Sequence, residues 1–228
     1  MGHNVSPQLF DKWPDQYDRW FETSIGSVIK GCEQGLIMEF LAPLAGERIL
    51  DAGCGTGVFT LDILAAGAHV AGVDLSLPML SKAASKCRLL HLSPVVGDIL
   101  RLPFKDKSFD KAVSITALEF IKDAKGAVKE LFRVTRSKGL VVVATLNSQS
   151  PWAERRRKEA ERKETIFSKA IFRSPRQMLS LALSPGIVRT AVHFQKEALP
   201  EAAIEAEREG REKGLRTGAF VAVRWQKP

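Results

Sequence analysis

Short apolar runs and longer segments with helical spacing alternate along most of this chain. Five runs are short and apolar enough to be strands, and the first, second and fourth are each followed by a segment with helix signals. The run 141–145 is continuously apolar, which is typical of a central parallel strand that is buried on both faces. The alternation predicts right-handed crossovers and a doubly wound α/β sheet. The predicted strands are 49–52, 69–73, 94–97, 111–115 and 141–145, and the predicted helices that follow them are 58–66, 77–87 and 124–134.

The remainder of the chain adds helices at both ends and two further strands. Residues 9–38 are helical in character, and a second helix over 28–41 should end at the Ala42-Pro43 dipeptide, because proline disfavours helix in the residue before it. The segments 154–169 and 197–213 are polar and helical in pattern, and Ser174-Pro175 starts a short helix. The strands 186–194 and 218–225 should pair with each other.

The first predicted strand ends in a glycine-rich turn, with Asp51, Gly53, Gly55 and Gly57 spaced two residues apart. A strand, a glycine turn and a helix N-terminus bring backbone N–H groups and the positive end of a helix dipole close to a ligand. The turn therefore predicts a site for a small polar molecule.

The spacing of this turn decides between two ligands. Dinucleotide enzymes use G-x-G-x-x-G, and this chain lacks the third glycine at that spacing. The carboxylate of Asp51 would repel a pyrophosphate, but it suits a ligand that carries an ammonium and a sulfonium group. On these residues the chain resembles the S-adenosylmethionine-dependent methyltransferases of class I. A nicotinamide-dependent oxidoreductase remains the alternative.

Two more strand ends carry acidic residues. Asp74 follows the second strand, seventeen positions beyond Gly57, where a carboxylate can accept both hydroxyls of a ribose. It could also cap the helix that begins near Ser76 and Pro78. The resemblance implies that Asp98 and Ile99 contact the adenine.

The resemblance extends over nearly the whole chain, with its specific motifs between Ile49 and Asp110. Tyr17-Asp18-Arg19-Trp20-Phe21, Leu102 to Asp110 and Leu146 to Trp152 are similar to the type-11-like, bacterial small-molecule group of these enzymes. It implies a Rossmann-like α/β/α fold with three layers and a doubly wound, seven-stranded, mostly parallel sheet whose last strand is antiparallel. The expected cofactor is S-adenosyl-L-methionine. The residues expected to bind it are Tyr17, Asp51, Gly53, Cys54, Gly55, Gly57, Asp74, Leu75, Met79, Asp98, Ile99 and Thr116.

The chain of 228 residues is long enough for one α/β domain and too short for two. We expect a single methyltransferase domain with four parts. Trp13, Tyr17, Trp20 and Phe21 share one helical face, which either packs on the core or forms a lid over the cofactor. The four parts are an N-terminal helical lid (1–45), a cofactor-binding core (46–146), a helical insertion on the substrate side (147–185) and closing strands (186–228).

The net charge of +8 raises the question of a nucleic-acid partner. Much of the charge falls in 154–169, where opposite charges stand three or four residues apart. This spacing favours a helix face that is solvated or that faces an anionic substrate. An RNA methyltransferase is the second alternative, and the absence of an Asn/Asp-Pro-Pro-aromatic signature at Ser114 to Ala117 counts against methylation of a base amino group.

The cysteines and the lengths of the apolar runs indicate the cellular compartment. The cysteines Cys32, Cys54 and Cys87 are far apart in sequence, which favours free thiols over disulfides or a metal site. No apolar run reaches 18 residues and the N-terminus lacks a signal-peptide pattern, so we expect a cytoplasmic protein without a membrane partner. The sequence predicts no oligomeric state.

The expected reaction is in-line transfer of a methyl group to a small-molecule acceptor. It needs a base only if the acceptor is protonated. Tyr17, Glu119 and His193 are candidate bases, but none lies in a motif, so no catalytic residue is assigned. Glu119 could instead have a structural role. Asn147 and Trp152 should border the substrate cavity. Methylation at a pyrimidine carbon is excluded, because no nucleophilic cysteine lies at the ends of the fourth and fifth strands.

Overall fold

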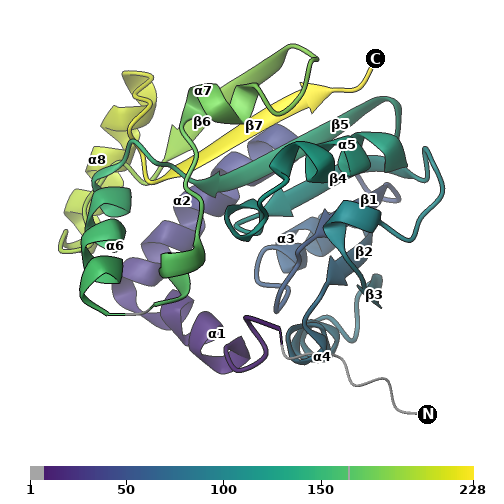
Figure 1. The fold of residues 1–228 in the computed structure, drawn as a ribbon, viewed down its shortest axis with the longest axis horizontal. Helices are drawn as coiled ribbons and strands as arrows, with labels where there is room; N and C mark the ends of the chain where they lie inside the picture. Colours follow the sequence, from purple (N-terminus) through teal and green to yellow (C-terminus); the bar gives the residue numbers. More distant parts are fainter. Residues whose placement is uncertain (1–7, 164) are drawn as a thin grey trace.

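A computed structural model describes residues 8–163 and 165–228, which form a seven-stranded sheet with helices on both faces (Figure 1). The strand order is β3-β2-β1-β4-β5-β7-β6. Neighbouring strands are parallel except that β7 runs antiparallel to both β5 and β6. The fold predicted from the sequence is therefore confirmed. The strands are β1 Arg48–Ala52, β2 His69–Asp74, β3 Leu92–Val96, β4 Phe109–Ile115, β5 Thr135–Leu146, β6 Gly186–Ala191 and β7 Phe220–Gln226.

Helices cover the two faces of the sheet in separate layers. Side chains of α2, α3 and α8 share one apolar cluster with the strands, and side chains of α5 and α7 share the other. The helices are α1 Pro14–Glu22, α2 Ser24–Leu41, α3 Thr60–Ala65, α4 Leu77–Lys86, α5 Ala124–Val134, α6 Pro151–Arg162, α7 Pro175–Leu179 and α8 Pro200–Glu212, with short 3₁₀ helices η1 Ile99–Arg101, η2 Leu118–Phe120 and η3 Ile166–Lys169.

The apolar run of β5 anchors both layers. Val142 and Ala144 pack into the cluster beneath α2, while Val141 and Val143 pack into the cluster beneath α5. Successive side chains of a strand point to opposite faces, and all four of these are fully buried. Burying one such valine is worth about 1.5–3 kcal/mol, so this run holds the middle of the sheet in register.

The observed elements differ from the predicted ones mainly at their ends. β5 begins at Thr135, six residues before the apolar run, because its first part extends over exposed polar residues and pairs with β4 at Phe109. The helical N-terminal segment is broken at Thr23, whose hydroxyl accepts a hydrogen bond from the Gly26 N–H and caps α2. α3 begins at Thr60 rather than near Val58.

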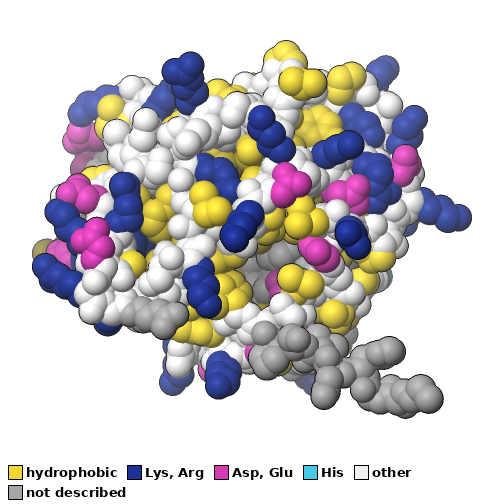
Figure 2. All heavy atoms as spheres, in the orientation of Figure 1, with side chains coloured by type: hydrophobic (Ala, Val, Ile, Leu, Met, Phe, Trp, Pro, Cys, Tyr) yellow, Lys and Arg dark blue, Asp and Glu magenta, His cyan; other side chains and the backbone are white. Residues whose placement is uncertain are grey.

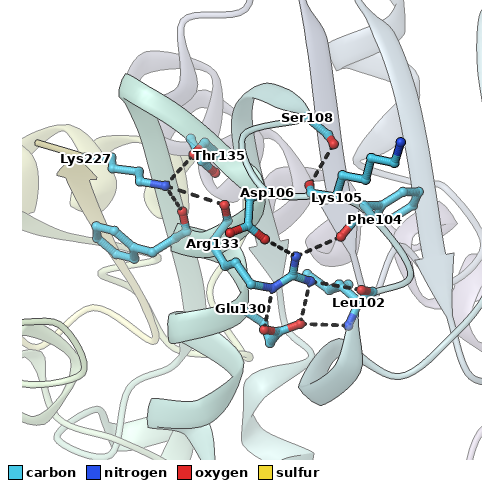
Figure 3. Close-up of polar contacts among 10 residues, drawn as sticks. Leu102, Phe104, Lys105, Asp106, Ser108, Glu130, Arg133, Thr135 and Lys227 are labelled. Atoms are coloured by element: carbon cyan, nitrogen blue, oxygen red, sulfur yellow. Dashed lines mark hydrogen bonds and ion pairs between the residues drawn. The ribbon is translucent and has the colours of Figure 1, made fainter.

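A network around Arg133 fixes the loop between η1 and β4 (Figure 3). The guanidinium of Arg133 donates hydrogen bonds to the carbonyls of Leu102 (3.0 Å) and Phe104 (2.8 Å) and to the carboxylate of Asp106 (2.8 Å). Glu130 on the same helix accepts from Arg133 and from the Leu102 N–H (3.0 Å). These contacts hold η1 at its place beside the end of β3.

Candidate functional site

A cavity of about 620 Å³ lies at the carboxyl ends of the central strands. The chain passes from β1 to β2 and β3 on one side of the sheet, and then returns to place β4 on the other side of β1. Ligands of open α/β sheets bind where the strand order reverses in this way. Residues after β1, such as Gly53, and after β4, such as Thr116, both line the cavity, whose volume is in the usual range for a small-molecule site.

The glycine turn after β1 forms one wall of the cavity. Gly53 and Gly55 have positive φ angles of 80° and 54°, a conformation that favours glycine. A Cβ added to Gly53 would lie 2.4 Å from the Cβ of Ala117, whereas a Cβ added to Gly55 would meet no atom within 4 Å. The turn thus packs closely on the chain after β4 at Gly53 and leaves open space at Gly55.

Asp51, at the end of β1, presents a buried carboxyl group to the cavity. Its Oδ2 accepts a hydrogen bond from the Thr60 hydroxyl at 2.6 Å, while its Oδ1 has no hydrogen-bond partner among the described residues. Burial raises the pKa of Asp51 to about 7, against the opposing effect of the Thr60 hydrogen bond. Asp51 therefore has one acceptor oxygen free for a ligand.

Asp74, at the end of β2, fastens the glycine turn. One of its oxygens accepts a hydrogen bond from the Gly55 N–H and the other from the Ser76 N–H, both at 2.9 Å. Burial raises the pKa of Asp74, and these backbone donors act in the opposite direction. The cap of α4 is Ser76, whose hydroxyl accepts from the Met79 N–H, so Asp74 does not act as the helix cap.

Most of the residues expected to bind the cofactor line this one cavity. Gly57 and Asp98 are the described candidates that do not: Gly57 packs against Ala83, and the Asp98 carboxylate accepts from the Leu100 N–H at 2.9 Å and caps η1. Their roles remain predictions. The cavity-lining candidates are Tyr17, Asp51, Gly53, Cys54, Gly55, Asp74, Leu75, Met79, Ile99 and Thr116.

Helix α1 lies over the cavity and is joined to the glycine turn. The Thr56 hydroxyl donates a hydrogen bond to Asp18 on α1 at 2.6 Å, and Lys86 on α4 forms an ion pair with the same carboxylate at 2.9 Å. The Tyr17 hydroxyl is 3.4 Å from the Thr116 hydroxyl. The aromatic face of α1 therefore contributes to the cavity as well as to the core. Residues 1–7 of the predicted lid lie outside the described residues.

The part of the cavity beyond the glycine turn has aromatic walls and several charged groups, three of which the sequence did not indicate as a set. Glu33 on α2, Glu119 on η2 and Arg156 on α6 all line it. Burial raises the pKa of Glu33 to about 8 and also raises the pKa of Glu119. A sequence signal existed for Glu33, because it interrupts the apolar stripe of Ile29, Leu36 and Ile37 on α2.

Two other residues expected near the substrate have structural roles. His193 is buried away from the cavity lining, and its ring nitrogens contact Glu207 at 2.9 Å and the Thr190 hydroxyl at 3.0 Å. The Asn147 amide donates to backbone carbonyls of the segment before β7. The prediction was therefore wrong for Asn147, and His193 is removed from the candidate bases. Trp152 lines the cavity as expected.

The charged helix α6 has the ion pairs that its spacing predicted. Lys158 pairs with Glu154 at 2.7 Å and Lys163 with Glu159 at 3.2 Å, on exposed side chains. On the face drawn in Figure 2, Lys and Arg side chains are scattered among acidic and hydrophobic ones. This distribution gives no single basic patch on that face. Of the described helices, none combines the length and apolar character that crossing a membrane requires. The three cysteines are free.

Comparisons with known proteins find similarity to methyltransferases. Residues 50–143 match the family model described as a methyltransferase domain. A malonyl-[acyl-carrier protein] O-methyltransferase of Erwinia billingiae is 43% identical over 107 residues, which are 46% of this chain and 41% of that protein. A demethylmenaquinone methyltransferase of Beutenbergia cavernae is 39% identical over 116 residues, which are 51% of this chain and 47% of that protein. The chain thus spans less than half the length of these relatives.

Solved structures share the fold over a larger part of the chain. A methyltransferase of Thermotoga maritima, described as a possible histamine N-methyltransferase, has a TM-score of 0.75 at 22% identity, covering 96% of this chain and 98% of its own. Geranyl diphosphate C-methyltransferase of Streptomyces coelicolor, solved with S-adenosyl-L-homocysteine, has a TM-score of 0.62 at 18% identity, covering 86% of this chain and 79% of its own. At these identities the likeness concerns the fold.

Proposed function

We propose that this protein transfers a methyl group from S-adenosyl-L-methionine to a small-molecule acceptor, since residues 50–143 match the family model described as a methyltransferase domain. One observation carries the proposal. A single cavity joins the glycine turn and the carboxylates of Asp51 and Asp74 to a second, aromatic part beneath α1 and α6. Such a cavity has room for a donor at one end and an acceptor at the other.

The residues of the first part suit the chemistry of this cofactor. The free Oδ1 of Asp51 is an acceptor for an ammonium group, and Asp74 is an acceptor at the position expected for ribose hydroxyls. Leu75, Met79 and Ile99 give apolar surface for a flat base. The open space at Gly55 lets a ligand approach the backbone. When bound, this cofactor supplies a methyl group activated by the positive charge on sulfur.

The chain's own residues bind and orient the methyl donor and the acceptor, and they exclude water from the cavity. Holding donor and acceptor in line can supply roughly 7–11 kcal/mol of the barrier. The Tyr17 hydroxyl has a pKa raised above its usual value by burial, so it stays protonated and acts as a hydrogen-bond donor rather than a base. Glu119 is the remaining candidate base, since its Oε2 lies in the buried part of the site without a hydrogen-bond partner among the described residues.

The thiols support a cytoplasmic location. Three free cysteines suit a reducing compartment such as the cytoplasm. The aromatic walls of the cavity, and the scattered charge on the face drawn in Figure 2, favour a small acceptor over RNA.

Equilibrium titration of the full chain by calorimetry tests the proposal. S-Adenosylmethionine and S-adenosylhomocysteine should each bind at one site, and NAD should give no heat. Binding of NAD with no heat from the sulfonium compound would return the chain to the nicotinamide enzymes. If the chain binds RNA with an affinity that falls steeply with salt, and binds no small acceptor, an RNA methyltransferase would be favoured.

A further inference from the structure

Arg156 is held in the cavity by two aromatic rings. It lies on α6, and its guanidinium carbon is 5.3 Å from the ring centre of Trp152 and 4.8 Å from that of Phe167. Contacts of this kind fix the plane of a guanidinium without using its N–H donors. Arg156 is therefore positioned in advance, with its hydrogen-bonding capacity free.

This guanidinium lacks the partner that its neighbours have. Arg155 forms an ion pair with Glu197, and Lys158 pairs with Glu154. By contrast, the Nη1 of Arg156 is buried and has no hydrogen-bond partner among the residues that the structure describes. Leaving a buried charged donor unpaired is costly, so this group favours a ligand that can accept its hydrogen bond.

The carboxyl groups across the cavity do not remove this charge. Neither Glu33 nor Glu119 forms an ion pair with Arg156 in the described part of the chain. Burial raises the pKa of Glu33 to about 8, so this group takes up a proton near neutral pH. A guanidinium has no comparable option, because it stays charged at any pH that proteins meet. Among these three groups, Arg156 therefore keeps a fixed positive charge while Glu33 is neutral below about pH 8. Arg155, Glu159 and Lys196 also line the cavity, and Arg155 is paired with Glu197.

We propose that Arg156 binds a carboxylate group of the methyl acceptor, and that the acceptor is an apolar molecule bearing one such acid. This inference rests on the proposed function, since it names the class of its substrate. The planar fork of arginine matches a carboxylate through two parallel hydrogen bonds. The apolar body of the acceptor packs on the apolar walls of the same cavity, which include Phe10, Phe120 and Ile121.

A matched series of ligands tests this assignment. The full chain saturated with S-adenosylhomocysteine is titrated with 3-phenylpropionate, 3-phenylpropanamide and 3-phenylpropylamine, and with straight-chain carboxylates of four to twelve carbons, and binding is followed by NMR. The wild type should bind the acid at least tenfold more tightly than the amide or the amine. Arg156→Met should lose this preference and keep its affinity for S-adenosylhomocysteine.

Two further variants serve as controls. Arg162→Met removes an exposed arginine of the same helix that does not line the cavity, and it should leave both affinities unchanged. Arg156→Lys keeps the charge without the planar fork, and it should retain only part of the preference for the acid. This variant also keeps the test usable if Arg156→Met does not fold.

Several results would overturn the assignment. They are tighter binding of the amine, equal binding of acid and amide, binding of none of the acids, or an acid preference that survives in Arg156→Met. The proposed function fails separately, if S-adenosylhomocysteine itself does not bind to the wild type.

Discussion

Buried carboxyl groups line the cavity at both of its ends. Asp51 and Asp74 close strands β1 and β2, and Glu33 and Glu119 lie in the aromatic part. Burial raises the pKa of all four, because a low-dielectric surrounding disfavours the charged form. Each of these residues therefore makes the stability of the protein depend on pH, and each also offers a contact for a ligand.

Glu33 gives the clearest pH prediction. Its pKa rises from 4.5 to about 8 on folding, so the folded state holds a proton that the unfolded state releases. The stability contributed by this group is complete below pH 4.5 and is lost as the pH rises to about 8, with a slope of up to about 1.4 kcal/mol per pH unit. Glu33→Gln should flatten that fall, as measured by urea unfolding at several pH values.

A matched variant on the same helix controls for the general pH response. Glu39 is exposed and pairs with Arg189 and Arg211. Glu39→Gln should leave the slope as it is in the wild type. A slope that is unchanged in Glu33→Gln would show that Glu33 is ionised in the folded protein.

Asp74 should contribute directly to cofactor affinity. Charged hydrogen bonds contribute about 1.5–3 kcal/mol, so Asp74→Ala should weaken S-adenosylmethionine binding by about tenfold to a hundredfold in calorimetry. Asp123→Ala removes a carboxylate that also accepts from backbone, at Gly126, but caps α5 outside the cavity. It should cost about 1 kcal/mol of stability and leave the affinity unchanged. Unchanged affinity in Asp74→Ala would leave Asp74 with only its contacts to Gly55 and Ser76.

At the level of elements, the glycine turn could be predicted from the sequence because its information is local. The strand, the glycines and the following helix are adjacent in the chain, so their spacing alone indicates a ligand-binding turn. The same local reasoning missed the start of β5, because the residues before its apolar run are polar and exposed. Of this part only Thr135 pairs with β4, opposite Phe109, and the backbones of Lys138 and Gly139 hydrogen-bond to Lys227 instead. No local pattern reveals these contacts.

Two substitutions within this turn should differ in their effect. Alanine at either position adopts an unfavourable positive φ, which costs about 1–2 kcal/mol. Gly55→Ala should cost no more than this, since its Cβ meets open space. Gly53→Ala should cost more, because its Cβ would collide with Ala117. Free energies of unfolding from denaturant titration would measure the difference, and equal losses would contradict the close packing at Gly53.

At the level of the whole molecule, the cavity is assembled from residues that are far apart in sequence. Glu33, Glu119 and Arg156 come from α2, η2 and α6, and the fold alone brings them together. The sequence did indicate that α6 could face an anionic substrate, but the periodicity of its charges did not distinguish Arg156 from its solvated neighbours. His193 shows the opposite case, because its partner Glu207 is supplied by α8 and satisfies it within the core.

The decisive measurement is a crystal structure of the full chain with S-adenosylhomocysteine. Ligand density should lie along the Gly53–Gly55 turn, with the ribose at Asp74, the base beside Met79 and the sulfur facing Trp152 and Arg156. Density for the ligand at another place, or side chains filling this crevice in a crystal soaked with saturating ligand, would contradict this placement.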